Sequence, residues 1–348
     1  MKIECSGKTE SLLKINSLLP ILASLVVYIF SSCSTDKDVS PVGSRETASI
    51  IVNVSAPAEP GTKADSGYKL RYIAQIFKGK TVNSWESQPV SRQEIIEGGS
   101  DGNQVVFKVD PNEYYIITVF ADYIPAGATA DAEGRYPDYF YNTTNAKKVI
   151  VNTTPGSTSG KVSAEFFNND NYDCFFVKQE GIYKEAEEYR LSLTLKRAVA
   201  KVVLRDKTSN TGDYSVKVNS LGNRTEFRFE TQTTVSGAEI SIDTPLVQIA
   251  GITPDSRDLF YFYTPAALVE GNNEKVSISF SAGSEENWLT NTVKDIPVKG
   301  NYKTIVTGTF LPDPLEEKPG DDDNPTKEGD IILDLSTDYE WAQTPLEN

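Results

Sequence analysis

Alternation of apolar and polar residues is the feature that most restricts the fold of this chain. In the segment Ala48 to Ser55, the apolar residues Ile50, Val52 and Val54 fall on every second position. Successive side chains of a strand point to opposite faces, so these three would line one face. Similar short segments recur along the chain between Gly, Pro, Asn and Asp residues, and the best helix candidate is the brief acidic segment Ile182 to Tyr189. We therefore predict an all-β protein.

A second segment near the end of the chain has the same pattern. Ile331, Leu333 and Leu335 alternate within IILDLS as the earlier three residues do within IIVNVS. Two strands with the same apolar face could occupy one groove in turn, which would be strand replacement between molecules. Both could equally be ordinary edge strands of one sandwich, because short alternating segments are common.

The remaining strand signals have the spacing of antiparallel β-sandwiches. We expect two of them, Val105 to Val109 and Tyr114 to Ala121, to pair across the turn sequence Asp110-Pro111-Asn112. We expect Leu259 to Tyr263 (LFYFY) to be a central strand, because it is apolar on both faces. The other predicted strands are Lys69–Phe77, Val149–Val151, Val162–Phe166, Leu191–Leu204, Tyr214–Val218, Glu239–Ile242, Leu246–Ile249, Lys275–Phe280 and Tyr302–Phe310.

Composition limits the domain count and the partners. A chain of 348 residues exceeds what one core usually organises, so we expect two domains with a core in each. Lys plus Arg number 34 against 49 Asp plus Glu, a formal net charge of −15. This balance argues against nucleic acid and anionic membrane headgroups as main partners.

The absence of histidine argues against an enzyme. The sequence has no His, which removes Ser/His/Asp and Cys/His mechanisms, His-ligated metal sites and the usual general base near neutral pH. The scattered carboxylates include no pair fixed at a catalytic distance. Asp321, Asp322 and Asp323 lack the spaced ligands of a calcium loop. We predict no catalytic residue, no metal and no cofactor.

The start of the chain has the form of an export signal. Lys2, Lys8 and Lys14 precede the apolar run Leu18 to Phe30, which is too short to span a bilayer comfortably and is followed by Ser31-Ser32-Cys33. This ending resembles the lipobox of bacterial lipoproteins, and the resemblance implies lipidation of Cys33. The alternative is a plain cleaved signal.

Three cysteines are too few for a disulfide framework. Cys5 and Cys33 belong to the signal, and Cys174 lies among aromatic residues, where a buried small apolar group is the best interpretation. A polar tether follows Cys33, and its Asp36 and Asp38 resemble the acidic surface-export tag of Bacteroidetes lipoproteins.

Several stretches resemble the fimbrillin family of Bacteroidales, the subunits of type V pili. They are Leu195–Lys201 (LKRAVAK), Pro297–Gly308 (PVKGNYKTIVTG), and Ala121–Tyr123 followed by Tyr139–Thr143 (YFYNT). The resemblance implies two transthyretin-like antiparallel β-sandwich domains in tandem, export as a lipoprotein, proteolytic removal of the first strand, and polymerisation by donor-strand exchange.

The composition and the resemblance together give a predicted domain plan. The stretch from Pro312 to Gly329 is rich in Pro, Asp and Glu and should be an extended linker. The plan is a lipoprotein signal (1–33), a tether (34–47), an N-terminal sandwich (48–189), a C-terminal sandwich (190–311), the linker (312–329) and a donor-strand segment (330–348).

Strand exchange would require a cut between the first and second strands. The Pro/Gly-rich loop Ala56 to Gly67 contains one basic residue, Lys63. A trypsin-like protease cuts after Arg or Lys in this region of the family, so the resemblance implies cleavage after Lys63, with Arg45 second. The displaced strand would carry Ile50, Val52 and Val54, and the donor strand Ile331, Leu333 and Leu335.

The predicted function is that of a structural subunit, a stalk or accessory pilin, of a cell-surface fimbria. Its partners would be other pilin subunits, a maturation protease and the outer membrane through the lipid anchor. The alternative is a surface glycan-binding lipoprotein that stacks sugars on Trp85, Trp288 or Trp341.

Overall fold

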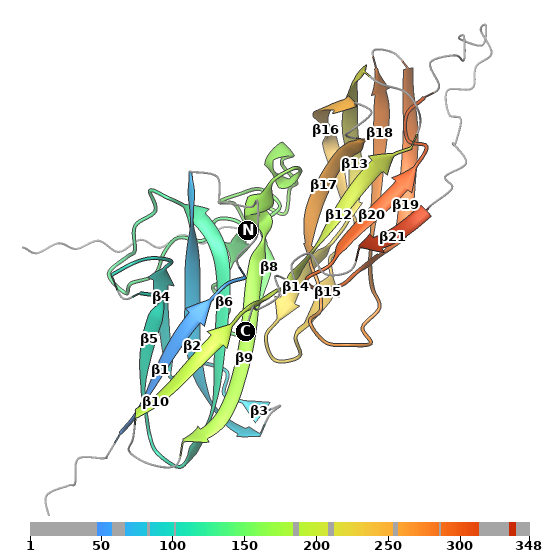
Figure 1. Ribbon diagram of the computed structural model, residues 1–348. Helices are drawn as coiled ribbons and strands as arrows, with labels where there is room; N and C mark the ends of the chain where they lie inside the picture. The colour runs from blue at the N-terminus through green and yellow to red at the C-terminus, as the bar shows by residue number, and fades with distance from the viewer. Residues whose placement is uncertain are drawn as a thin grey trace, which may run out of the picture. The chain divides into compact units, whose positions relative to one another are not determined.

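The structure is a computed structural model that describes residues 47–57, 67–81, 84–100, 102–183, 188–207, 212–252, 257–284, 287–312 and 334–338. Within these residues the regular structure consists of strands and two short 3-10 helices (Figure 1). The predicted all-β class is confirmed.

The first sandwich is built from a small and a large sheet. The small sheet has the order β10-β1-β5 and contains β1 (Ala48–Ser55), β5 (Gln104–Val109) and β10 (Glu188–Thr194). The large sheet has the order β11-β9-β6-β2-β3, with β4 also paired to β2. Its strands are β2 (Tyr68–Thr81), β3 (Ser84–Trp85), β4 (Ser91–Ile96), β6 (Glu113–Pro125), β9 (Cys174–Tyr183) and β11 (Lys196–Arg197).

The alternating residues of the first strand form the core between these two sheets. Ile50, Val52 and Val54 of β1 are buried in one cluster with alternate residues of β2, which contains the predicted strand Lys69–Phe77. These residues of β2 are Leu70, Tyr72, Ala74 and Ile76. The period-two pattern therefore predicts the inward face of both strands correctly.

The second sandwich also has two sheets. One has the order β17-β12-β20-β21 and contains β12 (Val199–Asp206), β17 (Asp258–Pro265), β20 (Lys303–Gly308) and β21 (Asp334–Asp338). The other has the order β16-β13-β18-β19 and contains β13 (Gly212–Gly222), β16 (Ile240–Ile252), β18 (Glu274–Ser284) and β19 (Asn287–Val298). Val202, Leu204 and Phe262 from one sheet and Val218 and Phe280 from the other belong to one buried cluster.

A fifth sheet joins strands from the two halves of the chain. Its order is β15-β14-β8-β7. The strands are β7 (Tyr141–Asn142), β8 (Lys148–Val151), β14 (Arg224–Arg228) and β15 (Thr233–Ser236), and the 3-10 helices η1 (Ala164–Phe166) and η2 (Asp170–Tyr172) follow β8.

The expectation that each domain has a core of its own is wrong for the second domain, because its core also contains residues of the first. Phe176 of β9 stacks on Phe229 with ring centroids 4.8 Å apart and meets Phe227 of β14 at 5.2 Å. The buried cluster that contains these rings continues from the outer face of the large sheet into the second sandwich. The large sheet thus buries apolar side chains on both faces, and residues 45–348 form one compact unit.

The predicted boundary between residues 189 and 190 falls inside β10. This strand runs parallel to β1, with Val52 opposite Leu191, so the first sandwich extends through Thr194. The predicted single element Leu191 to Leu204 is in fact three strands, β10, β11 and β12, in three different sheets. The pairs β1–β10 and β12–β20 are parallel, which the alternating pattern alone does not reveal.

Two other expectations about neighbouring strands are wrong. β5 and β6 do not pair across the turn at Asn112, because β5 pairs with β1 while β6 lies between β2 and β9. β17 lies at the edge of its sheet, where Asn168 covers it through a backbone N–H to the Tyr261 carbonyl at 2.9 Å. Ile182 and Tyr183 belong to β9, and residues 188 and 189 to β10.

The motifs LKRAVAK and PVKGNYK meet where the second sandwich begins. The N–H of Gly300 donates to the Ala267 carbonyl at 3.0 Å, and that of Asn301 donates to the Val199 carbonyl at 3.0 Å. Asn301 has a φ of +64°, the left-handed region that an Asn side chain tolerates. These contacts give a structural reason for the resemblance of both stretches.

Replacing Gly300 with Ala should lower the free energy of unfolding by about 1–3 kcal/mol, because a Cβ would overpack this junction. It would lie 2.9 Å from the Ala267 carbonyl oxygen and 3.2 Å from that of Arg197, which are backbone atoms. Urea unfolding measures the change. Gly127→Ala is the control, since no atom lies within 4 Å of its Cβ, and an equal stability of the two variants would contradict the prediction.

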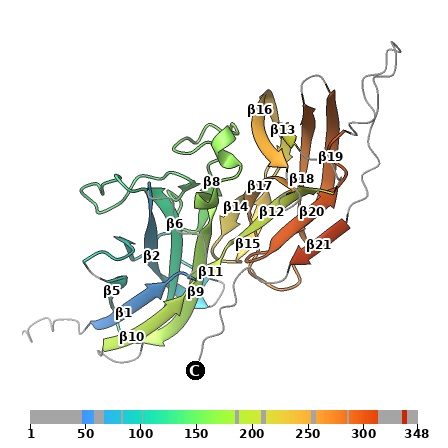
Figure 2. The ribbon, with the colours of Figure 1, turned by 45° about the horizontal axis from the view of Figure 1, so that its top comes forward.

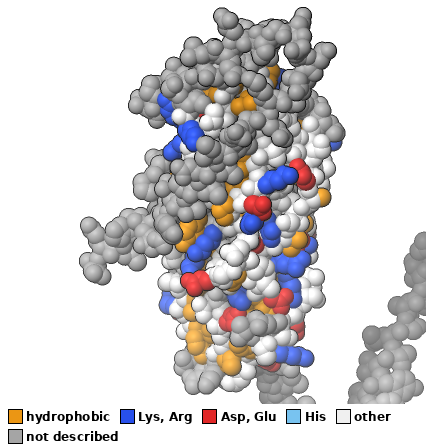
Figure 3. All heavy atoms as spheres, turned by 90° about the vertical axis from the view of Figure 1, so that its right-hand side faces the viewer, with side chains coloured by type: hydrophobic (Ala, Val, Ile, Leu, Met, Phe, Trp, Pro, Cys, Tyr) orange, Lys and Arg blue, Asp and Glu red, His pale blue; other side chains and the backbone are white. Residues whose placement is uncertain are grey.

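The described surface carries both signs of charge. On the face shown in Figure 3, Lys and Arg side chains are interspersed with Asp and Glu, and hydrophobic side chains form small groups. No helix among the described residues is long and apolar enough to cross a membrane.

Candidate functional site

The first candidate site is the groove that β1 fills in the small sheet. β1 lies between β5, which is antiparallel to it, and β10, which is parallel to it (Figure 1). Ile50 and Val52 are fully buried and Val54 is 4 % exposed. The strand therefore supplies both the middle of a hydrogen-bonded sheet and part of the core beneath it.

Polar contacts hold both ends of β1 in register. The Lys108 Nζ donates to the Ser49 Oγ at 2.5 Å, and the Gln104 Nε2 donates to the Asn53 Oδ1 at 3.0 Å. After the strand, the N–H of Ala56 donates to the Tyr72 hydroxyl at 3.3 Å. That hydroxyl donates in turn to Glu97, and burial followed by the Glu97 charge raises the pKa of Tyr72, which keeps the donor protonated.

The structure places only some of the predicted site residues. Ile50, Val52 and Val54 lie together in the groove. Cys33, Arg45, Lys63, Ile331 and Leu333 lie outside the described residues. Leu335 is among the described residues and belongs to β21.

A donor strand that is free for another molecule would lie outside its own sandwich, and for the C-terminal strand this expectation is wrong. β21 pairs antiparallel with β20 of the same chain, with Leu335 opposite Val306 and Asp338 opposite Lys303. The physical reason is that an edge strand presents unpaired N–H and C=O groups, which a further strand can satisfy. β20 has β12 on one side and would otherwise be such an edge.

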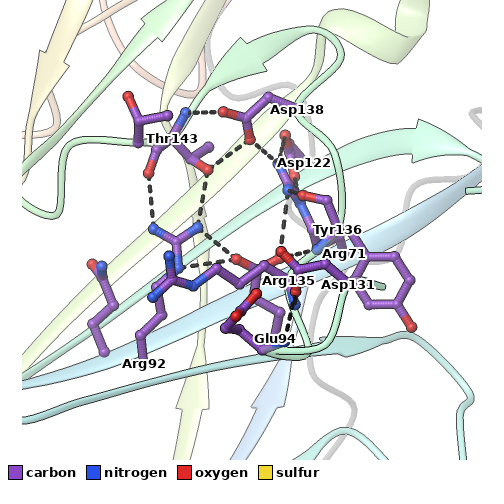
Figure 4. Close-up of polar contacts among 12 residues, drawn as sticks. Arg71, Arg92, Glu94, Asp122, Asp131, Arg135, Tyr136, Asp138 and Thr143 are labelled. Atoms are coloured by element: carbon purple, nitrogen blue, oxygen red, sulfur yellow. Dashed lines mark hydrogen bonds and ion pairs between the residues drawn. The ribbon is translucent and has the colours of Figure 1, made fainter. Parts of the chain in front are cut away.

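The second candidate site is a buried ion cluster in the first sandwich (Figure 4). Arg71 of β2 forms two parallel hydrogen bonds with Asp122 of β6, at 2.9 Å from Nε and 2.8 Å from Nη2. Both side chains are fully buried. The same guanidinium contacts Asp138 at 3.2 Å and Glu94 at 3.5 Å, so three carboxylates surround one cation.

A second arginine extends this cluster to the connection between β6 and β7. Arg92 binds Glu94 and donates to the Thr143 carbonyl at 2.8 Å. Asp138 accepts from the Thr143 N–H and hydroxyl, each at 2.7 Å. The Tyr136 carbonyl accepts from Arg71 at 3.0 Å. The cluster therefore fixes residues 136–143 against the outer face of β2 and β6, as Figure 4 shows.

Burial and charge pairing oppose each other in this cluster. Burial raises the pKa of Asp122 to about 6, although the adjacent Arg71 acts to lower it. Burial alone would lower the pKa of Arg71, but Asp122, Glu94 and Asp138 raise it above its ordinary value. The guanidinium is thus permanently charged, and it is what makes three nearby carboxylates tolerable inside the fold.

Sequence reasoning missed this cluster, although a signal was present. Arg71 and Asp122 stand inside the apolar stretches LRYIA and FADYI, where a charge must be paired. Asp122 belongs to one of the stretches that resemble fimbrillins and Thr143 to another. The cluster joins these stretches in space, so their pattern reflects an internal brace of the fold.

The candidate aromatic and thiol residues are built into the fold. Trp85 is 8 % exposed and lies between the ammonium groups of Lys147 and Lys178, at 5.8 and 5.5 Å from its ring. The ammonium group of Lys217 lies 3.6 Å from the Trp288 ring centroid, and Trp341 lies outside the described residues. Cys174 is buried, and burial raises the pKa of its thiol well above the usual value, which makes it a poor nucleophile.

Comparison with known proteins assigns the chain to a family. A family model described as "Family of unknown function (DUF6562)" matches residues 42–344, and the chain belongs to this family. No protein in the curated collection of sequences matches the chain.

Three of the solved structures to which the chain is similar are described here. A candidate cell adhesion protein from Bacteroides eggerthii is 12 % identical, with a TM-score of 0.44, over 84 % of this chain and 95 % of that chain. The tip fimbrial protein Mfa3 from Porphyromonas gingivalis is 14 % identical, with a TM-score of 0.41, over 85 % and 100 %. A fimbrial assembly protein from Parabacteroides distasonis is 9 % identical, with a TM-score of 0.35, over 75 % and 91 %.

Proposed function

We propose that this protein is a structural subunit of a cell-surface fimbria, a stalk or accessory pilin that polymerises by exchange of its first strand. The observation that carries the proposal is the position of β1, a central strand whose removal would open a groove between β5 and β10. The descriptions of the solved structures above name the same broad class of protein.

Removal of β1 would leave a site that demands a replacement strand. Ile50, Val52 and Val54 would each leave an apolar depression, and each such side chain stabilises by about 1.5–3 kcal/mol when buried. The backbone groups of β5 and β10 that face β1 would also lose their partners. A strand from another molecule can satisfy both requirements by β-strand addition.

The C-terminal segment is suited to supply that strand. Ile331, Leu333 and Leu335 repeat the alternation of β1. β21 is bound along one side only, since β20 is its strand partner among the described residues. Before the linker, the Asp206 carboxylate accepts from the N–H groups of Phe310 and Leu311 at 2.9 and 3.2 Å, which anchors the root of the linker to the sandwich.

Export and maturation complete the proposal. Lipidation at Cys33 would attach the chain to the outer membrane, and cleavage after Lys63 would separate β1 from β2. Cleavage after Arg45, the second choice, would release the lipid but leave β1 joined to β2. Asp36 and Asp38 would act in surface export. In this scheme the partners are other pilin subunits and the maturation protease.

Leu333→Asp should abolish polymers while the monomer stays folded. A carboxylate on the inserted face of a donor strand would enter the apolar groove unpaired, which is costly. Gel electrophoresis of unboiled outer-membrane material should show a high-mass ladder for the wild type and a single band for the variant. Ser336→Asp adds the same charge to the opposite face and should keep the ladder. Ladders from the Leu333→Asp protein would contradict the proposal.

The competing function, a surface glycan-binding lipoprotein, predicts a different result in the same material. The chain would run as a single band for wild type and both variants, and its lipid would remain attached at Cys33. Cys33→Ala removes the acylated thiol and should abolish lipid labelling and membrane association in either case.

A further inference from the structure

The two sandwiches are copies of one seven-strand topology. In the small sheet, β1 lies parallel to β10 and antiparallel to β5. In the second sandwich, β12 lies in the same way parallel to β20 and antiparallel to β17. Each copy therefore has its first strand between its last strand and its fourth long strand.

The opposing sheets repeat as well. The large sheet of the first sandwich contains the order β9-β6-β2-β4, and the second sandwich has β19-β18-β13-β16, with antiparallel neighbours throughout. Taken in chain order, β1, β2, β4, β5, β6, β9 and β10 correspond to β12, β13, β16, β17, β18, β19 and β20. The last strands β10 and β20 are thus equivalent.

The copies differ at the outer edge of the last strand. β21 covers this edge of β20, whereas β10 pairs only with β1 among the described strands (Figure 2). The β10 edge is also usable. The N–H of Leu195 points to β1, where it donates to the Ser55 carbonyl at 2.9 Å. Backbone groups alternate along a strand, so those of Arg190 and Ser192 point away from β1.

In β20, the same alternation directs the corresponding backbone N–H and C=O groups toward β21. The Tyr302 carbonyl points to β12, where it accepts from the Lys201 N–H at 3.1 Å. The backbone groups of Ile305 and Thr307 therefore point to β21, where their register partners are Ser336 and Asp334. The edge that β21 occupies on β20 is the edge that β10 leaves open.

The connection to β21 is much longer than its position on β20 requires. An antiparallel neighbour needs a loop of about 2–5 residues. Between Leu311, which Asp206 anchors, and the start of β21, the chain has residues 312–333, which number 22 (333 − 311). Fully extended, such a length reaches about 70 Å. This tether can therefore carry β21 to another molecule.

We propose that the outer edge of β10 binds β21 of a second copy of this chain as an antiparallel strand, just as β20 binds its own β21. Arg190 is exposed on β10, where its guanidinium forms an ion pair with Glu188 of the same strand. The contact extends the small sheet while β1 stays in place and the chain stays uncut. It is thus separate from the replacement of β1 proposed above.

A strand peptide tests this contact, because β20 in the intact chain is already covered. The peptide comprises residues 330–341 with Ser336→Cys, and the protein is the full chain with Cys5→Ser and Cys33→Ser. Single cysteines are introduced on the exposed face of the small sheet, as Arg190→Cys or Ser192→Cys on β10 and Lys108→Cys on β5. Disulfide formation under mild oxidation is measured by intact mass, with a scrambled peptide as control.

The proposal predicts at least a tenfold excess of disulfide with the strand peptide over the scrambled peptide at position 190 or 192, and none at position 108. No excess at either β10 position would overturn it. Disulfide at position 108 as well would also overturn it, because the strand would then lie next to β5, either in place of β1 or on the outer edge of β5, and not specifically beside β10. A peptide signal at β10 alone, in a chain that forms no fimbriae, would leave the contact standing while the proposed function fails.

Discussion

We expect Arg71→Met to lower the free energy of unfolding by about 3–5 kcal/mol at pH 7. The substitution keeps much of the side-chain volume but removes the cation that Asp122, Glu94 and Asp138 surround. Three carboxylates then remain near one another inside the fold, and the fixation of residues 136–143 through the Tyr136 carbonyl is lost. Denaturant unfolding at pH 7 measures the loss.

The same variant should recover part of its stability at pH 5. Without Arg71, the influence that lowers the pKa of Asp122 is gone, so this pKa rises beyond its value of about 6. A carboxyl whose pKa is higher in the folded state than in the unfolded state, where it is near 3.8, stabilises the fold as pH falls through the folded value. A pH-independent loss, or a loss below about 1 kcal/mol, would show that the cluster does not brace the fold.

Val52→Asp should unfold the first sandwich, with a loss of about 4–5 kcal/mol or more. Val52 is fully buried in the middle of β1, opposite Val105 and Leu191, and the described residues of its buried cluster are hydrophobic. A carboxylate there has no partner and a high cost of desolvation. Loss of the dispersed backbone NMR signals of β1, β5 and β10 is the measurement.

The matched control for this substitution is Asn53→Asp. Asn53 is the next residue on β1, faces the other side and is only half-buried, and its contact is the Gln104 amide. Its replacement should change stability by less than about 1 kcal/mol. If both variants were equally stable, β1 would not be part of the core, and the groove that it fills would have no energetic basis.

The sequence predicts the faces of strands better than their neighbours. Alternation identifies Ile50, Val52 and Val54 as an inward face because side-chain direction is a local property of a strand. Pairing depends on contacts between distant segments, so the turn at Asn112 looks like a hairpin although β5 and β6 enter different sheets. Nothing in the local sequence of β10 indicates that it pairs in parallel with β1.

The ion cluster shows why a candidate site of this kind is difficult to predict. Arg71 and Asp122 are 51 residues apart, and nothing in either strand names the other as its partner. What the sequence does offer is a charged residue inside an apolar strand, which requires a buried partner of opposite charge. The LFYFY stretch is apolar on both faces and yet forms the edge strand β17, so this pattern does not reveal the position of a strand in its sheet.

The most direct test of strand exchange is the N-terminal sequence of the chains in the detergent-resistant ladder, read together with their intact mass. Replacement of β1 predicts that these chains begin at Ala64, after the cut at Lys63, and lack Ala48 to Ser55 while retaining Ile331 to Leu335. Ladder chains that still carry Ala48 to Ser55 would contradict that account.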